Sequence, residues 1–327
     1  MLLRPAPRHR IPISLLVVFL LVALSTTVIV TMTSDDASRS TPTSASGTGV
    51  VGGAWRAAVG DGAIPWPKDG QAAVGLEGTA STDTRGEQRP VPIASLTKVM
   101  TAYVILKDHP LEPGAPGPRI EVDRQAADEV GVGDESTVPV RAGQKYSQHQ
   151  LLQLMLIPSA NNVARLLARW DSGSQGAFAR KMQRTADELG MDQSTYMGAS
   201  GIEAGTTSTA ADQLKLTGQA MKNPVFRDIV ASRTVTVPGI GLVHNSNSLL
   251  GTSGVVGIKT GSSTPAGGNL LWASEVRLGD RTRLLLGAVL HQRANTTPGE
   301  GLQAALDSSR VLIDGLRDQL ASARTES

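Results

Sequence analysis

The sequence contains no cysteine among its 327 residues. Disulfides, thiol catalysis and thiolate metal sites are therefore excluded. Its five histidines show no spacing typical of metal ligands, which argues against a zinc hydrolase, and we expect no cofactor. Aromatic residues make up only 3% of the chain, so leucine, valine, isoleucine and alanine must fill the core.

The net positive charge of the chain comes from its first residues. The net charge is +2, and Arg4, Arg8 and Arg10 precede every acidic residue, so the rest of the chain carries −1 without them. No cluster of lysine and arginine typical of a nucleic-acid surface occurs in that remainder. We therefore expect no nucleic-acid partner.

Residues 11–32 form an apolar run without a single charge. A helix of that length spans roughly 33 Å at about 1.5 Å per residue, which matches the core of a bilayer. Arginines precede the run and Asp35 and Asp36 follow it, so residues 1–10 are predicted to be cytoplasmic and the bulk of the chain external. We expect a single-pass transmembrane signal anchor.

A cleaved signal peptide is the alternative, and it would give a secreted protein. Ala23 and Ser25 have the small-x-small form of a cleavage site. The apolar residues Val28-Ile29-Val30 follow that site and argue against cleavage. A buried core helix at a terminus with this charge asymmetry is disfavoured as well.

Residues 33–53 are rich in Ser, Thr, Asp and Gly and contain hardly any large apolar side chains. This composition is typical of a flexible linker. The folded domain is therefore expected over residues 54–327, beginning near Trp55.

Strand patterns lie on both sides of a central run of helical patterns. Strands are expected at Gln71–Leu76, Ile120–Val122, Thr137–Val140, Val235–Val237, Val255–Thr260, Asn269–Ala273 and Leu284–Leu290. Helices are expected at Ser95–Asp108, Gln148–Leu156, Ala160–Trp170, Ser174–Leu189, Thr209–Lys222 and Gly301–Leu320. The last three strands suit antiparallel neighbours. This order predicts an α+β fold, in which an antiparallel sheet packed by terminal helices carries an inserted helical subdomain.

Three short motifs stand in order along the folded part. They are S-L-T-K at Ser95–Lys98, S-A-N at Ser159–Asn161 and K-T-G at Lys259–Gly261. Each is weak alone, because short strings of this kind are common by chance. Together they indicate one active site in which a lysine activates a serine nucleophile.

Ser95 and Lys98 lie three apart, so a helix would place both side chains on one face. A serine hydroxyl needs an adjacent base, and a lysine serves as one only if its pKa is lowered. Burial would lower the pKa of Lys98, and so would the charge of Lys259 if the fold brings the two together. A solvent-exposed helix turn is the alternative, but the apolar stretch Val99–Leu106 indicates that the segment is buried.

The other two motifs also have plain structural explanations. Ser159 either relays protons or only caps the following helix, and Asn161 could bind a substrate amide. Lys259 and Thr260 end a β-branched strand, where they could face a carboxylate, and Gly261 would permit close approach of a ligand. A solvated strand end is the alternative there, and Gly267-Gly268 is read as a possible turn.

Longer segments around the motifs point to a known family. They are P-I-A-S-L-T-K-V-M-T-A at Pro92–Ala102, L-I-P-S-A-N-N at Leu156–Asn162, S-T-A-A-D at Ser208–Asp212, N-S-L-L-G at Asn247–Gly251 and G-I-K-T-G at Gly257–Gly261. From about Trp55 onward the chain resembles the serine D-alanyl-D-alanine carboxypeptidases, which are low-molecular-mass penicillin-binding proteins. The resemblance implies a β-lactamase/transpeptidase-like fold in a protein of the bacterial cell membrane.

The resemblance also implies catalytic roles. Ser95 would attack the carbonyl between two D-alanines, Lys98 would take its proton, and Ser159 would relay a proton to the leaving amine. Backbone N–H groups of Ser95 and Ser262 would form the oxyanion hole. Water would then release the shortened peptide.

Substrate binding is implied for a second set of residues. Asn161 would orient the substrate, while Lys259, Thr260 and Gly261 would hold its terminal carboxylate. The expected activity is a serine D,D-carboxypeptidase that removes the terminal D-alanine from peptidoglycan stem peptides through an acyl-enzyme. β-Lactam antibiotics would be covalent inhibitors.

Two other functions compete with this one. One is a β-lactamase or esterase of the same fold. A class A β-lactamase would need a deacylating glutamate between the second and third motifs, usually in E-x-x-L-N, and Glu188 and Glu203 lack that context. A catalytically idle cell-wall-binding module has no need for both lysines. Two departures from the family pattern, at Met197–Glu203 and Val256, bear on substrate preference.

Overall fold

The computed structural model describes residues 53, 55–56, 59, 64–79 and 82–322. The cytoplasmic tail, the membrane segment and nearly all of the linker predicted above lie outside these residues. Across the described part, none of the helices combines the length and the apolar character needed to cross a membrane. Trp55, near which the folded domain is expected to begin, is buried, and its Nε1 donates to Asp83 Oδ2 at 2.8 Å.

An antiparallel sheet of five strands forms the middle layer of the domain, with the order β2–β1–β11–β10–β9. The strands are β1 (Gln71–Leu76), β2 (Thr82–Arg85), β9 (Val255–Ser263), β10 (Gly267–Leu278) and β11 (Arg281–Gln292). Both faces of β10 are covered by other elements. Its consecutive residues Leu270-Leu271-Trp272-Ala273 are therefore all apolar and buried. Strand β9 lies at the edge of the sheet.

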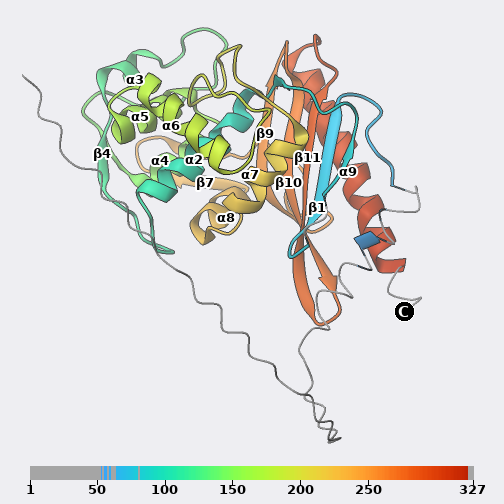
Figure 1. The fold of residues 1–327 in the computed structure, drawn as a ribbon. Helices are drawn as coiled ribbons and strands as arrows, with labels where there is room; N and C mark the ends of the chain where they lie inside the picture. Colours follow the sequence, from blue (N-terminus) through green and yellow to red (C-terminus); the bar gives the residue numbers. More distant parts are fainter. Residues whose placement is uncertain (1–52, 54, 57–58, 60–63, 80–81, 323–327) are drawn as a thin grey trace, which may run out of the picture. The chain divides into compact units, whose positions relative to one another are not determined.

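One face of the sheet is covered by the C-terminal helix α9 (Pro298–Ser322), as Figure 1 shows. Leu312 and Leu316 of this helix are fully buried in one apolar cluster with Trp272 and Trp55. Gly268 lets the strand approach the helix, because a Cβ at that position would collide with the carbonyl oxygen of Gly301. Gly267 and Gly268 therefore belong to β10 and are not a turn.

The opposite face of the sheet carries a block of helices (Figure 1). They are α2 (Thr97–Asp108), α3 (Arg124–Asp128), α4 (Gln148–Leu156), α5 (Asn161–Ser172), α6 (Gln175–Glu188), α7 (Ala210–Ala220) and α8 (Pro224–Ala231). Helix α7 contacts β1 and β11, and α8 contacts β9. Helix α2 passes through the centre of the block and is buried continuously from Thr97 to Ala102, which places a lysine in the core.

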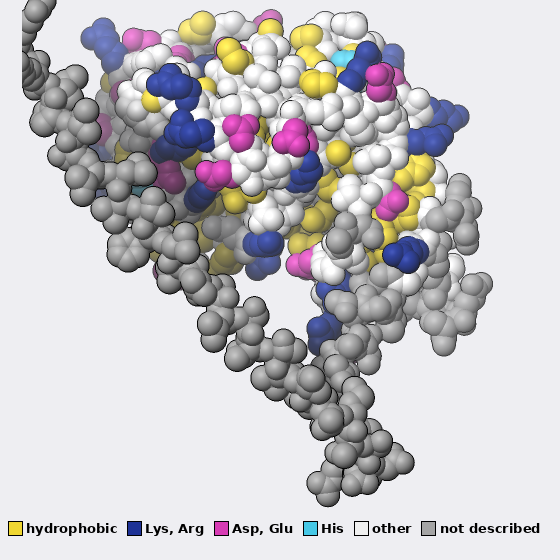
Figure 2. Space-filling model, viewed as in Figure 1, with side chains coloured by type: hydrophobic (Ala, Val, Ile, Leu, Met, Phe, Trp, Pro, Cys, Tyr) yellow, Lys and Arg dark blue, Asp and Glu magenta, His cyan; other side chains and the backbone are white. Residues whose placement is uncertain are grey.

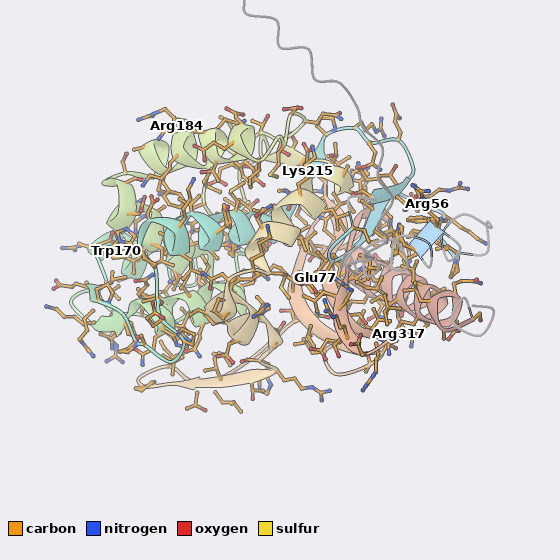
Figure 3. All side chains as sticks on the ribbon, turned by 60° about the horizontal axis from the view of Figure 1, so that its bottom comes forward. Arg56, Glu77, Trp170, Arg184, Lys215 and Arg317 are labelled. Carbon is orange, nitrogen blue, oxygen red and sulfur yellow. The ribbon has the colours of Figure 1, made fainter. Side chains whose placement is uncertain are left out.

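In the described part of the chain, three short pairs of strands lie outside the five-stranded sheet. They are β3 (Val91–Pro92) with β6 (Thr207–Ser208), β4 (Arg119–Glu121) with β5 (Lys145–Ser147), and β7 (Thr234–Val237) with β8 (Gly241–His244). Acidic and basic side chains are interspersed over the face shown in Figure 2. Trp170, at the end of α5, and Arg317 of α9 lie on opposite sides of the domain (Figure 3).

The α+β fold expected from the sequence is confirmed, including the antiparallel neighbours β9, β10 and β11. The strand predicted at Thr137–Val140 is wrong. Val138 N donates to the side chain of Asn162, at Oδ1 and 3.2 Å, and not to a neighbouring strand, while Asn162 Nδ2 donates to Val138 O at 3.0 Å. A buried side chain thus replaces the strand pairing that the pattern predicts.

Candidate active site

The first motif lies on a 3-10 turn, Ala94–Leu96, that continues into α2. Ala94 has φ +47°, in the left-handed region, and its carbonyl accepts a hydrogen bond from Thr97 Oγ1 at 2.8 Å. Such a conformation is strained for a residue with a Cβ by roughly 1–3 kcal/mol. It brings Ser95 to the start of α2 with Lys98 one turn on, and Lys98 Nζ lies 2.8 Å from Ser95 Oγ.

Lys98 Nζ has three hydrogen-bond partners and is fully buried. Besides Ser95 Oγ they are Asn161 Oδ1 at 2.6 Å and Ser200 O at 2.8 Å. The two carbonyl oxygens can only accept hydrogen bonds, whereas a hydroxyl can also donate. A neutral lysine has two N–H groups and one lone pair. If the carbonyls take both N–H groups, the lone pair faces the Ser95 hydroxyl.

The pKa of Lys98 is lowered well below its ordinary value. Burial is the largest cause, followed by the positive charges of Lys259 and Arg165, while Glu203 and Glu135 oppose the shift. Burial also lowers the pKa of Lys259 to about 7. Both causes anticipated from the sequence for Lys98 are therefore present, and they make the neutral form that a base requires more accessible than it is in an ordinary lysine.

Ser159 lies directly before Ala160, the residue that precedes α5, and is not the N-cap. Ala160 occupies that position and makes no side-chain capping bond, while Ser159 has φ +65°. The capping role is excluded because Ala160 is the N-cap and no hydrogen bond joins the Ser159 hydroxyl to the first turn of α5. Within the described part of the chain, Ser159 Oγ is buried and has no hydrogen-bond partner. Buried hydroxyls rarely lack a hydrogen-bond partner, and this one is available to form a hydrogen bond with a ligand.

Asn161 is held at both ends of its amide. Its Oδ1 accepts from Lys98, and its Nδ2 donates to Glu135 Oε2 at 3.0 Å. Arg165, one turn further along α5, donates to the same glutamate oxygen at 2.7 Å. Sequence reasoning did not anticipate Glu135, Arg165 or Ser200 O, because no local pattern shows which loop carboxylate or carbonyl will meet α5 and α2.

The third motif lies on the edge strand β9. Lys259 is 1% exposed, and its Nζ donates to Thr260 O at 3.0 Å. A Cβ on Gly261 would lie 2.9 Å from Ile93 O and 3.1 Å from Ser95 N. The glycine is thus needed so that β9 can pass close to the backbone of Ser95, which is a different reason from the ligand approach expected above. Ser262 follows directly, so the N–H groups of Ser95 and Ser262 come from adjoining segments.

The comparisons with known proteins agree with this geometry. The sequence profile of the D-alanyl-D-alanine carboxypeptidase family matches residues 82–286, a range that includes all three motifs. A D-alanyl-D-alanine carboxypeptidase of Streptomyces sp. strain K15 is 32% identical over 213 residues, which are 60% of this chain and 70% of that protein. A D-alanyl-D-alanine endopeptidase of Pseudomonas aeruginosa is 31% identical over 192 residues, 56% of this chain and 59% of that protein.

Solved structures give the same result. The crystal structure of the Streptomyces K15 DD-transpeptidase has a TM-score of 0.65 and 25% identity, covering 78% of this chain and 97% of that one. Penicillin binding protein 6B from Escherichia coli has a TM-score of 0.65 and 26% identity, covering 77% and 79%. With a profile match over more than half of its length, the chain belongs to the D-alanyl-D-alanine carboxypeptidase family of serine peptidases.

Proposed function

We propose that this enzyme removes the terminal D-alanine from peptidoglycan stem peptides through an acyl-enzyme on Ser95. The observation that carries the proposal is the hydrogen-bond arrangement of Lys98, which lies 2.8 Å from Ser95 Oγ while its two other partners can only accept. This arrangement presents a lone pair to the serine hydroxyl, as a general base must.

The proposed reaction begins when Ser95 Oγ bonds to the carbonyl carbon of the penultimate D-alanine and its proton passes to Lys98 Nζ. The N–H groups of Ser95 and Ser262 stabilise the charge on the carbonyl oxygen. The C–N bond then breaks, and D-alanine leaves after its amine takes a proton through the Ser159 hydroxyl. Water hydrolyses the remaining ester and restores the hydroxyl of Ser95.

Lys259 and Thr260 are proposed to hold the substrate's free carboxylate, with Asn161 orienting the peptide and Gly261 leaving room for it. Among the described residues Lys259 donates only to Thr260 O, so two of its N–H groups remain for a ligand. A buried ammonium without a counterion gains most from binding an anion, because nothing else offsets its desolvation. This preference for a free carboxyl end favours exo-acting cleavage.

The decisive experiment combines two measurements on one preparation. Incubation with a diacyl-D-Ala-D-Ala peptide should release free D-alanine, which a cell-wall-binding module without activity would not do. Penicillin should form a stable adduct on Ser95, because the ring-opened product stays attached and blocks the approach of water. Intact-protein mass spectrometry detects the adduct, and its appearance on the Ser95→Ala variant would refute the assignment of the nucleophile.

Residues 11–32 are proposed to anchor the enzyme in the bacterial cell membrane, with residues 1–10 in the cytoplasm and residues 33–53 linking to an extracytoplasmic catalytic domain. The support is the uncharged length of the run and its charged flanks. The stem peptides of the cell wall lie on that external side, so this orientation brings enzyme and substrate together.

A further inference from the structure

The amide of Asn161 contacts groups of opposite hydrogen-bonding character. On one side Lys98 Nζ donates to Oδ1 at 2.6 Å, and on the other Nδ2 donates to Glu135 Oε2 at 3.0 Å. An ionised carboxylate accepts hydrogen bonds and cannot donate them. Only one of the two amide orientations satisfies both neighbours, and Glu135 is the partner that selects it.

Glu135 is itself held in place from α5. Arg165 Nη2 donates to the same Oε2 at 2.7 Å, and Arg165 Nε donates to Glu129 Oε2 at 2.9 Å. Asn161 and Arg165 are four residues apart and lie on one face of the helix. The loop is also fixed through its backbone, because Asn161 N donates to Ser136 O at 2.7 Å.

The opposite amide orientation would disable the base. The NH2 group of Asn161 would then face Lys98, where it would donate to the lone pair of the neutral amine, and the carboxylate of Glu135 would face a carbonyl oxygen. The lone pair would no longer be available to Ser95 Oγ. The orientation of one amide thus decides whether Lys98 can take the serine proton.

We propose that Glu135 is a positioning residue of this active site. It fixes the Asn161 amide with Oδ1 toward Lys98, and so directs the Lys98 lone pair at Ser95. The proposal rests on Lys98 being the base of the proposed function. It assigns a role in catalysis to a loop carboxylate that lies outside the three motifs.

A purely structural role must be distinguished from this one. Glu129 offers the matched control, because it also accepts from Arg165 but has no hydrogen bond to Asn161. If Glu135 serves only to hold Arg165 and the loop, then losing either glutamate should have similar effects. If it acts through Asn161, only the loss of Glu135 should slow acylation.

The test measures the rate constant of acylation by benzylpenicillin, followed by intact-protein mass spectrometry on the full-length chain. Glu135→Met keeps the side-chain length without the carboxylate and should slow acylation by about 10-fold or more, the scale of one hydrogen bond to a charged group. Glu129→Met should stay within about 2-fold of wild type. Circular dichroism establishes that each variant is folded.

Glu135→Gln provides the rescue and serves also if the methionine variant does not fold. Arg165 can only donate, so it selects the orientation in which the glutamine oxygen occupies the position of Oε2 and still accepts from Asn161. Acylation should therefore stay within about 3-fold of wild type. A glutamine variant as slow as Glu135→Met would overturn the proposal.

A double-mutant cycle with Asn161→Ala completes the experiment. Without the amide there is nothing for Glu135 to orient, so Glu135→Met should cause no further loss in that background. An equal loss in both backgrounds, or an equal loss in Glu129→Met, would overturn the proposal. Failure of the underlying function would look different, because wild type itself would then neither release D-alanine nor acquire the adduct.

Discussion

At the scale of single residues, two buried lysines dominate the site. Lys98 and Lys259 are both almost fully buried, and the positive charge of Lys259 helps to lower the pKa of Lys98. Their proposed tasks need opposite protonation states. Lys98 must be neutral to act as a base, whereas Lys259 must be charged to bind a carboxylate.

This opposition predicts a bell-shaped dependence of kcat/KM on pH. Activity should rise as Lys98 loses its proton, and the lowered pKa of Lys98 moves this rise below the pH at which an ordinary lysine deprotonates. Activity should fall as pH increases beyond the pKa of Lys259, about 7, because the neutral amine no longer attracts the carboxylate. The measurement is kcat/KM for a diacyl-D-Ala-D-Ala peptide across pH. A value that keeps rising to about pH 9 would contradict these roles.

The Lys98→Arg variant distinguishes a role of Lys98 as a general base from a role as a positive charge alone. Arginine keeps the positive charge but does not deprotonate in a protein. Acylation by penicillin should fall by roughly 10²-fold or more, on the scale of general-base contributions. The same adduct assay measures it. Near-normal acylation in this variant would point to a different base.

Thr260 is a more specific probe of carboxylate recognition than Lys259. Its side chain carries no charge, so replacing it should not change the pKa of Lys98, whereas the charge of Lys259 lowers that pKa. A charge-assisted hydrogen bond contributes roughly 1.5–3 kcal/mol. Amidating the substrate's C-terminus should therefore reduce kcat/KM of wild type by at least about 10-fold, and should penalise Thr260→Val distinctly less. Equal penalties in the two enzymes would show that Thr260 does not contact the carboxylate.

At the scale of elements, local patterns predicted most of the fold. The bounds predicted from the helical pattern of Gln148–Leu156 match those of helix α4, and in the structure Ser147 and Gln150 form a capping box at its start. The predicted elements do not include α8, although Asn223 and Pro224 carry N-cap and N1 signals. The strand expected at Thr137–Val140 fails for a different reason, since a side chain distant in sequence binds that backbone.

The candidate active site, too, could be predicted from the sequence only in part. Motif order predicts that Ser95, Lys98, Asn161 and Lys259 belong to one site, and Lys98 forms hydrogen bonds with Ser95 and Asn161. The contacts of Glu135 depend on how a loop folds back on α5, and sequence periodicity carries no information about that. The conformation of Ser159 likewise follows from tertiary packing and not from its capping propensity.

The contact between β10 and α9 gives a prediction about stability. A Cβ on Gly268 would collide with the backbone carbonyl of Gly301, which cannot rotate away as a side chain would. Gly268→Ala should therefore lower the free energy of unfolding by about 1–3 kcal/mol, as overpacking does. Gly299→Ala is the control, because nothing lies within 4 Å of a Cβ there. Denaturant unfolding of both variants measures the difference, and equal stabilities would contradict the packing argument.

At the scale of the whole molecule, the site depends on two layers meeting. Ser95 and Lys98 come from the helical block, while Lys259 comes from the edge of the sheet. The helix α9 on the far face supports the sheet without contributing a site residue, so damage to α9 should act through stability. The membrane segment proposed at residues 11–32 precedes this domain in the sequence.

The membrane prediction concerns that segment. If residues 11–32 stay attached, the enzyme should sediment with the bacterial membrane and its N-terminal sequence should begin at the leader. A flexible chain over residues 33–53 would have a root-mean-square span of roughly 25 Å, enough to hold the domain clear of the lipid surface. Fractionation followed by N-terminal sequencing tests whether the protein is in the membrane and whether its leader is retained.

Replacing two apolar residues of the run with lysines should release the protein from the membrane fraction, because charges are costly in a bilayer core. A mature chain that starts near Thr26 and is found in the medium would show instead that the leader is cleaved.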